Sequence, residues 1–388
     1  MLSFVVLLFS CVNNSENTDE VKVFDVSNPE QVSLGDIFSE LEVIYMDAGV
    51  ESYVQGTRYV RPCGDKYLFM DNSLNIYVFD TKGHYISSSK DVKGHGRGEF
   101  IIPMGGCYNP YTKNIEIITP THLMFYDMNF KFVKSVQLPS EYPGEKNDNK
   151  SLFFDEIYDL SDHLHILITN NDRRGQDVNS LFLFDSKTKQ IIKKMSFDED
   201  VIHDIHSQAF PFQDYDDENL LFLPPRTSKY IYKFNKETHE LHPFISFKYG
   251  EDYYSEEKLE QICKSSGPME MYKYMNNNPK NMPLRESYSD GKFYILADGG
   301  TSKIFDSNLI IVDTNTENVK ILPFKKDDKN QLYIPSLVSD NILYISQSEP
   351  EINESLIASF PGKVTEINKY KADSTLNDNI AVLKYHLK

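Results

Sequence analysis

The chain has 388 residues, of which 40% are apolar, and its formal net charge is −18 at pH 7. This composition fits a soluble globular body and excludes a membrane-embedded or unfolded chain. The acidity argues against binding to nucleic acid or to anionic lipid, because both need Lys and Arg to neutralise phosphate. The chain also has 25 Tyr and 25 Phe, which favour β structure because aromatic side chains pack well on a half-buried pleated surface.

Residues 1–10 are predicted to be a secretion signal peptide, since they are apolar but too short to span a bilayer. The run Leu8-Phe9-Ser10-Cys11 resembles a bacterial lipobox, in which the signal is cut before a cysteine that then receives lipid. Residues 11–20 are polar and aperiodic, as suits a flexible tether. We therefore expect a lipidated Cys11 that attaches the protein to a membrane through this N-terminal lipid only. The alternative is an ordinary cleaved terminus in which Cys11 has no role.

The body of the chain, residues 21–388, repeats one pattern six times. In each unit a polar turn precedes a β-prone run, and a second run follows. The first runs are anchored at Tyr67, Ile115, Leu164, Leu220, Phe293 and Ile342. The second runs are residues 76–80, 123–127, 181–185, 230–235, 309–313 and 381–385. Four of the second runs end in Asp and one in Asn, residues whose side chains start turns.

Units of about 50 residues, each a small antiparallel meander, are typical of β-propeller blades. One such unit cannot bury both of its faces, so neighbouring units must stack around an axis. We therefore predict an all-β fold, a six-bladed β-propeller over residues 21–388. The competing interpretation is a pair of β-sandwiches, which we rank lower because a sandwich does not require a constant period.

Two features depart from the repeat. Residues 21–25 have no partner within a unit, and the last unit ends with its second run. Strands near the N-terminus are therefore predicted to complete the final blade and to remove a free edge. An insertion at about 251–284 has helix formers after Ser255, which favours a short helical insertion between late blades. We expect it to lie over one mouth of the ring, or to be a solvated decoration.

Residues 66–106 contain the repeat in its fullest form. Residues 75–80, Gly83, the run Gly94-His-Gly-Arg-Gly-Glu-Phe100 and Pro103 resemble an NHL-type propeller repeat. More closely, almost the whole chain from residue 20 resembles the six-bladed β-propeller lipoproteins common in Bacteroidetes. The segments that support this resemblance are residues 34–44, 94–100, 220–234 and 379–385. The resemblance implies the propeller fold and an outer-membrane lipoprotein, facing the periplasm or the cell surface.

The glycine-rich loop at 94–100 does not match a phosphate-binding loop. It lacks Gly-Lys-Ser/Thr, it departs from the spacing G-x-G-x-x-G, and no helix follows it. We expect a tight crossing between blades that needs positive φ at glycine. Such a loop would hold Arg97 and Glu99 in place as candidate ligand-binding residues. The alternative role for the two side chains is a local ion pair.

No metal site is predicted. His163 and His165 would face the same side of one strand, but no third ligand can be located, and we expect two half-exposed histidines. Residues 198–206 and 214–219 are acidic but lack the spacing of a known metal site or calcium loop.

The cysteines form no C-x-x-C pair and no zinc-like cluster. Cys63 and Cys107 lie at similar places in adjacent repeats, so a disulfide between them is one alternative. Two separate buried thiols are the other, and we favour it.

The sequence therefore predicts a class of function. Our first hypothesis is an envelope-anchored, non-catalytic binding module, with a glycan, a peptide or an envelope protein as partner at one mouth of the ring. The alternative is a hydrolase or lyase with an active site, calcium-dependent in one version, at the central channel. A third is a subunit of an envelope complex. We identify no catalytic residue and no cofactor.

Overall fold

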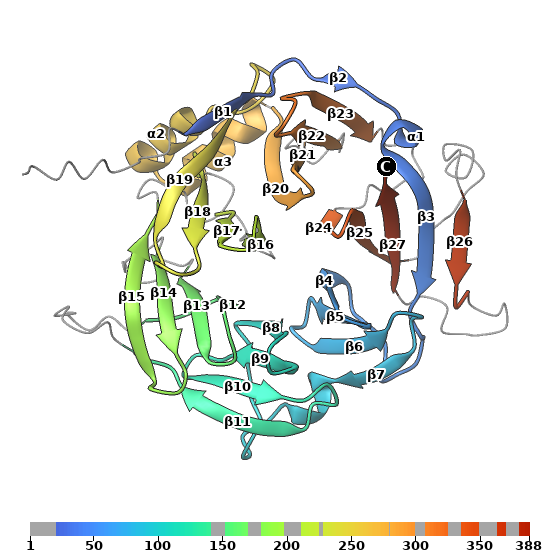
Figure 1. Cartoon of the computed structure of the whole chain (residues 1–388), viewed down its shortest axis with the longest axis vertical. Helices are drawn as coiled ribbons and strands as arrows, with labels where there is room; N and C mark the ends of the chain where they lie inside the picture. The colour runs from blue at the N-terminus through green and yellow to red at the C-terminus, as the bar shows by residue number, and fades with distance from the viewer. Residues whose placement is uncertain are drawn as a thin grey trace, which may run out of the picture.

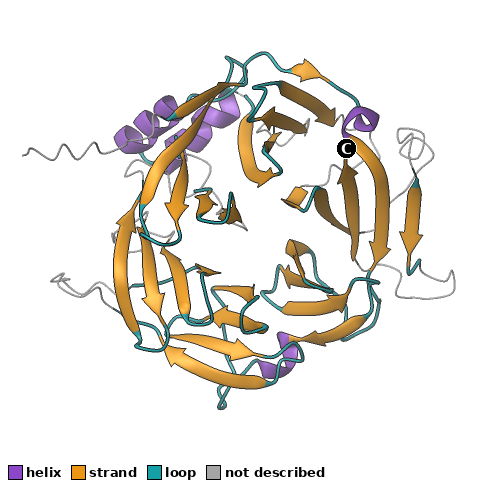
Figure 2. Ribbon diagram, in the orientation of Figure 1, coloured by secondary structure: helices purple, strands orange, loops and turns teal. Residues whose placement is uncertain are grey.

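The structure is a computed structural model that describes residues 21–140, 152–169, 180–197, 211–224, 228–278, 280–298, 307–324, 335–348, 363–369 and 380–388. These residues form six sheets arranged in a ring around a central axis (Figure 1). The prediction of a six-bladed β-propeller is confirmed. Figure 2 shows that strands make up the ring and that helices lie only at its edge.

The first three blades each have four antiparallel strands, which follow the chain from the axis outward. Blade 1 contains β4 (Thr57–Cys63), β5 (Lys66–Asp71), β6 (Ile76–Asp80) and β7 (Tyr85–Ser88). Blade 2 contains β8 (Gly105–Asn109), β9 (Asn114–Ile118), β10 (His122–Tyr126) and β11 (Phe132–Gln137). Blade 3 contains β12 (Glu156–Asp159), β13 (Leu164–Thr169), β14 (Ser180–Asp185) and β15 (Gln190–Ser196).

The last three blades each gain a strand from the N-terminal segment. Blade 4 contains β16 (Phe212–Asp214), β17 (Asn219–Phe222), β18 (Ile231–Asn235), β19 (Leu241–Lys248) and, outside them, β1 (Lys22–Asp25). Blade 5 contains β20 (Met282–Ser289), β21 (Lys292–Asp298), β22 (Ser307–Asp313), β23 (Val319–Phe324) and β2 (Glu30–Gln31). Blade 6 contains β24 (Pro335–Ser339), β25 (Ile342–Ser348), β27 (Ile380–Leu387), β3 (Phe38–Tyr45) and β26 (Val364–Ile367).

The ring is closed by β3, the strand from the N-terminal segment that lies inside blade 6. It pairs antiparallel with β27, where Val43 faces Leu383, and parallel with β26 on its other edge. The predicted closure by N-terminal strands is therefore confirmed. Residues 21–25 take another place, since β1 pairs parallel with β19 of blade 4. On the way to β3 the chain covers the outer edges of two blades, which removes edges that could pair with other molecules.

The hydrophobic core is divided among the interfaces between neighbouring blades. Between blades 6 and 1, for example, Ile44 and Val382 join Val60, Phe69 and Phe79 in one buried cluster. Five similar clusters occupy the other five interfaces in the part of the chain that the structure describes. Each blade therefore needs both neighbours to bury its apolar side chains, which explains the regular repeat of the sequence.

Helices are short and lie at the edge of the ring. Between β2 and β3 is α1 (Leu34–Ile37), and a 3-10 turn, η1 (Ser89–Val92), follows β7. The insertion forms α2 (Glu256–Ser266) and α3 (Pro268–Asn277), with Ser255 as the N-cap of α2. Figure 1 shows α2 and α3 beside β1 and β19, away from the axis. This position contradicts the expectation that they lie over one mouth of the ring. Their apolar side chains pack with Tyr254 and Met282.

Within the described residues, we find no helix with the length and apolar character needed to cross a bilayer.

The closing strand should carry much of the stability. Leu41 on β3 is fully buried between blades 5 and 6, so Leu41→Ala is expected to lower the free energy of unfolding by about 2–5 kcal/mol. The matched control is Val23→Ala on β1, where the side chain is 60% exposed and the change should stay within about 0.5 kcal/mol. Urea unfolding measures both, and equal losses would contradict a closing role for β3.

Candidate functional site

The glycine-rich loop connects η1 to β8 and is built around the side chain of Glu99. The carboxylate Oε2 accepts a hydrogen bond of 2.8 Å from the Gly96 amide. A Cβ at Gly94 would lie 2.1 Å from the same oxygen, so this glycine makes room for the carboxylate. Only Gly98 has positive φ, at +78°, and a Cβ there would lie 2.5 Å from the Phe132 ring. The expected need for positive φ therefore holds at Gly98 but not at Gly94 or Gly96.

Arg97 and Glu99, the two predicted ligand-binding residues, both line a groove of about 800 Å³ beside this loop. Its other wall comes from β10 and β11 and includes Val133, which is 51% exposed. Glu99 bonds to the loop backbone, and no ion pair with Arg97 is found among the described residues. The groove is open, and it lies on blade 2.

A second pocket, of about 520 Å³, lies at the mouth of the central channel. The innermost strand of every blade contributes to its lining. These contributions are Arg61 from β4, Cys107 from β8, Asp159 from β12, Asp214 from β16, Ser289 from β20 and Ser339 from β24. We call this cavity the channel-mouth pocket. Because all six blades meet here, it is the place where the ring can hold one ligand from all sides.

The lining of the channel-mouth pocket includes four aspartates and two basic side chains, Arg61 and Lys236. Exposed Asp214, Asp290 and Asp340 come from three consecutive blades. Lys236 Nζ lies 3.0 Å from Asp214 Oδ1. Tyr111, 59% exposed, adds an aromatic ring from blade 2. Such a mixture of hydrogen-bonding groups and an aromatic surface is what a small polar ligand requires.

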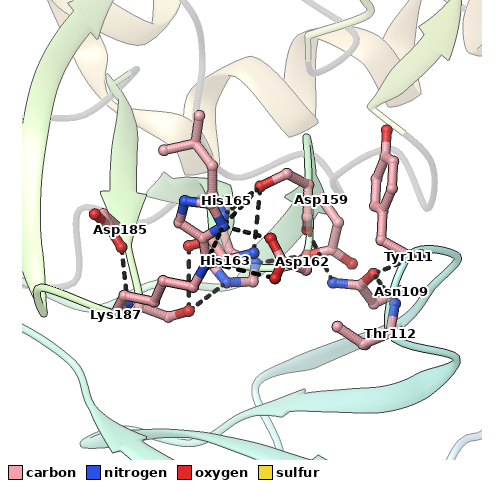
Figure 3. Close-up of polar contacts among 12 residues, drawn as sticks. Asn109, Tyr111, Thr112, Asp159, Asp162, His163, His165, Asp185 and Lys187 are labelled. Atoms are coloured by element: carbon pink, nitrogen blue, oxygen red, sulfur yellow. Dashed lines mark hydrogen bonds and ion pairs between the residues drawn. The ribbon is translucent and has the colours of Figure 1, made fainter.

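Behind this pocket is a buried polar cluster at the interface of blades 2 and 3. It consists of Cys107 on β8, Glu116 on β9, Asp159 on β12 and His165 on β13, and we call it the interblade cluster. His165 Nδ1 lies 2.6 Å from Asp159 Oδ1 and 3.4 Å from Glu116 Oε2. Cys107 Sγ lies 3.2 Å from Asp159 Oδ2. Figure 3 shows the contact between His165 and Asp159 and the nearby Asn109.

The electrostatics of the interblade cluster follow from its burial. Burial, and to a smaller extent the negative charge of Asp159, raises the pKa of Glu116 well above its usual range. Burial likewise raises the pKa of the Cys107 thiol. The rings of Phe125 and Phe184 flank His165, so the cluster is a polar island in an apolar interface.

The histidine prediction is wrong for His165, which is fully buried. His163 lies just before β13, with its side chain 34% exposed and in contact with Asp162. Sequence reasoning found no further ligand because Cys107, Glu116 and Asp159 come from three other strands. One signal was present, since Glu116 is the only charged residue in an apolar run, which is unusual unless its carboxylate has a buried partner.

Ser186, His165 and Asp159 have the connectivity of a catalytic triad. His165 Nε2 lies 3.0 Å from Ser186 Oγ, while Nδ1 contacts Asp159. The Ser186 hydroxyl, however, donates its hydrogen to the His163 carbonyl at 3.1 Å. Ser186 is only 5% exposed and does not line the channel-mouth pocket. The arrangement therefore orients His165 and does not present a nucleophile to a substrate.

The remaining predicted residues divide into two groups. Cys63 and Cys107 are free, buried thiols, which confirms the expectation of two separate thiols. In the acidic run at 214–219, Asp216 Oδ1 accepts hydrogen bonds from the amides of Glu218 and Asn219 and shapes a turn. Cys11 and residues 198–206 lie outside the described residues.

Fold and pocket together define a class, a six-bladed β-propeller with a polar pocket at one end of its axis. A protein-family model described as a six-bladed β-propeller, DUF5128, matches residues 12–294, and the chain belongs to this family.

Two solved structures are similar in fold. One is a Bacteroides fragilis protein described as exported, with a TM-score of 0.69 and 15% identity over 95% of this chain and 100% of that chain. The other is a member of the DUF4221 family from Bacteroides vulgatus, with a TM-score of 0.51 and 11% identity over 91% of this chain and 97% of that chain. At such identities the similarity concerns the fold alone. No curated protein matches this sequence.

The loop crossing at Gly98 gives a direct test of the packing. Gly98→Ala should destabilise the protein by about 1–2 kcal/mol through its left-handed backbone and by a further amount of about 1–3 kcal/mol through overpacking against Phe132. Gly64→Ala is the matched control, because Gly64 has φ +62° and a Cβ added there would meet no atom within 4 Å. Thermal unfolding should show the larger loss at Gly98, and equal losses would contradict the role of Phe132.

Proposed function

We propose that this protein is an exported, lipid-anchored binding module whose channel-mouth pocket binds a short glycan without turnover. The observation that carries the proposal is the convergence of all six blades on one polar pocket of about 520 Å³. The carboxylates of Asp214, Asp290 and Asp340 would accept hydrogen bonds from sugar hydroxyls. Tyr111 would supply the flat apolar surface against which a sugar ring stacks.

A binding role is favoured over a hydrolase or lyase activity because the candidate nucleophile, Ser186, is buried. Ser186 is 5% exposed, and its hydroxyl donates a hydrogen bond to the backbone carbonyl of His163. A calcium-dependent active site would need several carboxylates around one ion. Among the described residues, the one group of potential ligand side chains within 4.8 Å of one another is Cys107, Glu116 and Asp159, which contains only two carboxylates. The three exposed carboxylates at the mouth are therefore assigned to ligand hydroxyls.

The proposed export and membrane anchoring rest on the N-terminal sequence and on a similar structure, not on the pocket. Residues 1–10 have the apolar character of a signal peptide, and Cys11 follows a lipobox-like run. A structurally similar Bacteroides protein is described as exported. We infer that Cys11 carries the lipid, that the protein resides at the outer membrane, and that the propeller extends from it on residues 11–20.

The pocket can be tested with an array of bacterial and host glycans, followed by calorimetry with the best-binding oligosaccharide. Asp340→Asn and Tyr111→Ala should each weaken binding about tenfold, since each removes an interaction worth roughly 1–1.5 kcal/mol. The controls are Asp65→Asn, in the turn after β4, and Tyr53→Ala, which is 46% exposed outside the pocket. Equal losses in variants and controls, or binding of peptides but no glycan, would reject the proposal.

The anchor can be tested separately by labelling cells with radioactive palmitate. Label should appear in the wild-type protein and in Cys263→Ala, and it should be absent from Cys11→Ala, because the lipid is attached through the cysteine sulfur and its new amino group. The Cys11→Ala protein should also leave the membrane fraction, since membrane binding scales with the acyl carbon buried. Membrane retention of Cys11→Ala would contradict the anchor.

A further inference from the structure

The outer edges of three blades in this molecule bind an extended segment of the chain. β1 pairs parallel with β19 on blade 4, β2 with β23 on blade 5, and β26 with β3 on blade 6. Among the described residues, β7, β11 and β15 have no such partner and are the outermost strands of blades 1, 2 and 3 (Figure 1). An outermost strand presents backbone amides and carbonyls to which a further strand can add.

The outer edge of blade 2 repeats the geometry of blade 4. In both outer strands one residue forms a bulge without a partner on the neighbouring strand, Val133 in β11 and Phe244 in β19. On blade 4 the four residues after the bulge, Ile245–Lys248, pair with Lys22–Asp25 of β1. The four residues after the bulge of blade 2 are Lys134–Gln137. They therefore occupy the position at which blade 4 binds an added strand.

The backbone of β11 has hydrogen-bonding groups on its outer side. The Leu138 amide bonds to the carbonyl of Thr121, just before β10. Because successive residues of a strand direct their backbone groups to opposite edges, the amide of Ser135 points away from β10. On blade 4 an outward carbonyl, that of Lys248, accepts a hydrogen bond of 2.9 Å from the Val26 amide. A strand added to β11 meets the same kind of partners.

The groove of about 800 Å³ beside the glycine-rich loop adjoins this edge, since Val133 and Ser135 belong to its lining. Ile101, Ile102 and Val133 are each more than half exposed. Exposed apolar side chains that gather around one groove indicate a contact surface for another molecule. β15 of blade 3 has an equivalent bulge at Ile192 but contributes no residue to this groove, so its edge serves as a comparison.

The charges around the groove favour an acidic occupant. Arg97 and Lys134 are exposed cations in its lining, and Lys134 Nζ lies 4.3 Å from the centre of the Phe125 ring. The one acidic side chain of the lining, Glu99, accepts a hydrogen bond from the Gly96 amide. The whole chain, in contrast, has a net charge of −18. Because salt screens charges more than about 10 Å away, the two nearby cations decide which peptide binds.

We propose that β11 and the adjoining groove bind an extended, acidic segment of another protein by parallel strand addition. The backbone of the segment extends blade 2 as β1 extends blade 4. Its apolar side chains lie over Ile101 and Val133, and its carboxylates pair with Arg97 and Lys134. The groove shares no lining residue with the channel-mouth pocket, so this site is independent of the proposed glycan binding.

The test uses the full chain with Cys11→Ala, which keeps it free of lipid, and a fluorescein-labelled octapeptide in which Val and Glu alternate. Fluorescence anisotropy should show saturable binding of one peptide per chain, which weakens as salt is added. A control peptide with Lys in place of every Glu should bind about tenfold more weakly, because like charges then meet at Arg97 and Lys134.

Ser135→Pro removes an outward amide of β11. It should weaken binding of the Val–Glu peptide about fivefold to tenfold, through the loss of one hydrogen bond. The fold should tolerate this change, since proline is accepted in an edge strand where the amide faces solvent. The matched control is Lys194→Pro, at the equivalent position of β15, which should leave peptide binding unchanged. Melting temperatures check that both variants are folded.

Val133→Asp provides a second variant, because it places a carboxylate beside those of the peptide. It should also weaken binding about tenfold, whereas Ile192→Asp, at the exposed bulge of blade 3, should not. This pair decides if Ser135→Pro fails to fold.

The proposal is overturned if the parent protein does not bind the Val–Glu peptide, or if the Lys peptide binds equally well. It is overturned if the blade 2 variants bind the peptide like their blade 3 controls. It is also overturned if ultracentrifugation shows that the parent protein is a dimer and that Ser135→Pro is a monomer, because a second copy of the chain then occupies the edge.

Discussion

The fold depends on the burial of both faces of every blade. A four-stranded sheet with apolar side chains on its two faces exposes one of them unless another sheet covers it, and in a ring each blade covers the next. The ring must therefore be complete before any blade has its full core. The chain achieves this by inserting β3 next to β27, which joins the first part of the folded chain to its last strand. Ile44 and Val382 then reach the apolar residues of blade 1.

Because the apolar side chains are buried between the blades, polar side chains lie around the central axis. Apolar side chains pack between the blades, and two of the innermost strands are short, since β16 has 3 residues and β12 has 4. Their ends and turns place Asp214, Asp290 and Asp340 around one pocket. The hydrophobic core and the pocket thus come from different parts of each blade. Changes at the mouth are tolerated by the interfaces, which is a general reason why propellers carry varied binding sites.

The interface of blades 2 and 3 is the exception to this division. There Glu116 and His165 are fully buried among aromatic rings. Burying these groups is unfavourable unless they are paired or bind a cation. The paired contacts of Asp159 with His165 and Cys107 offset part of this cost, and the raised pKa of Glu116 favours its neutral, protonated form.

The sequence by itself determined the repeat, the number of blades and the closure of the ring. Those features follow from local patterns, such as the apolar runs anchored at Tyr67 and Ile115, and from the need to bury both faces. It did not reveal the innermost strands β8, β12 and β16, whose residues are few and mixed in polarity. Since these strands line the channel, the residues of the pocket were missed with them. Only the tertiary structure decided that Glu116 contacts His165 and that Asp214 and Asp340 line the same pocket, because each pair comes from different blades.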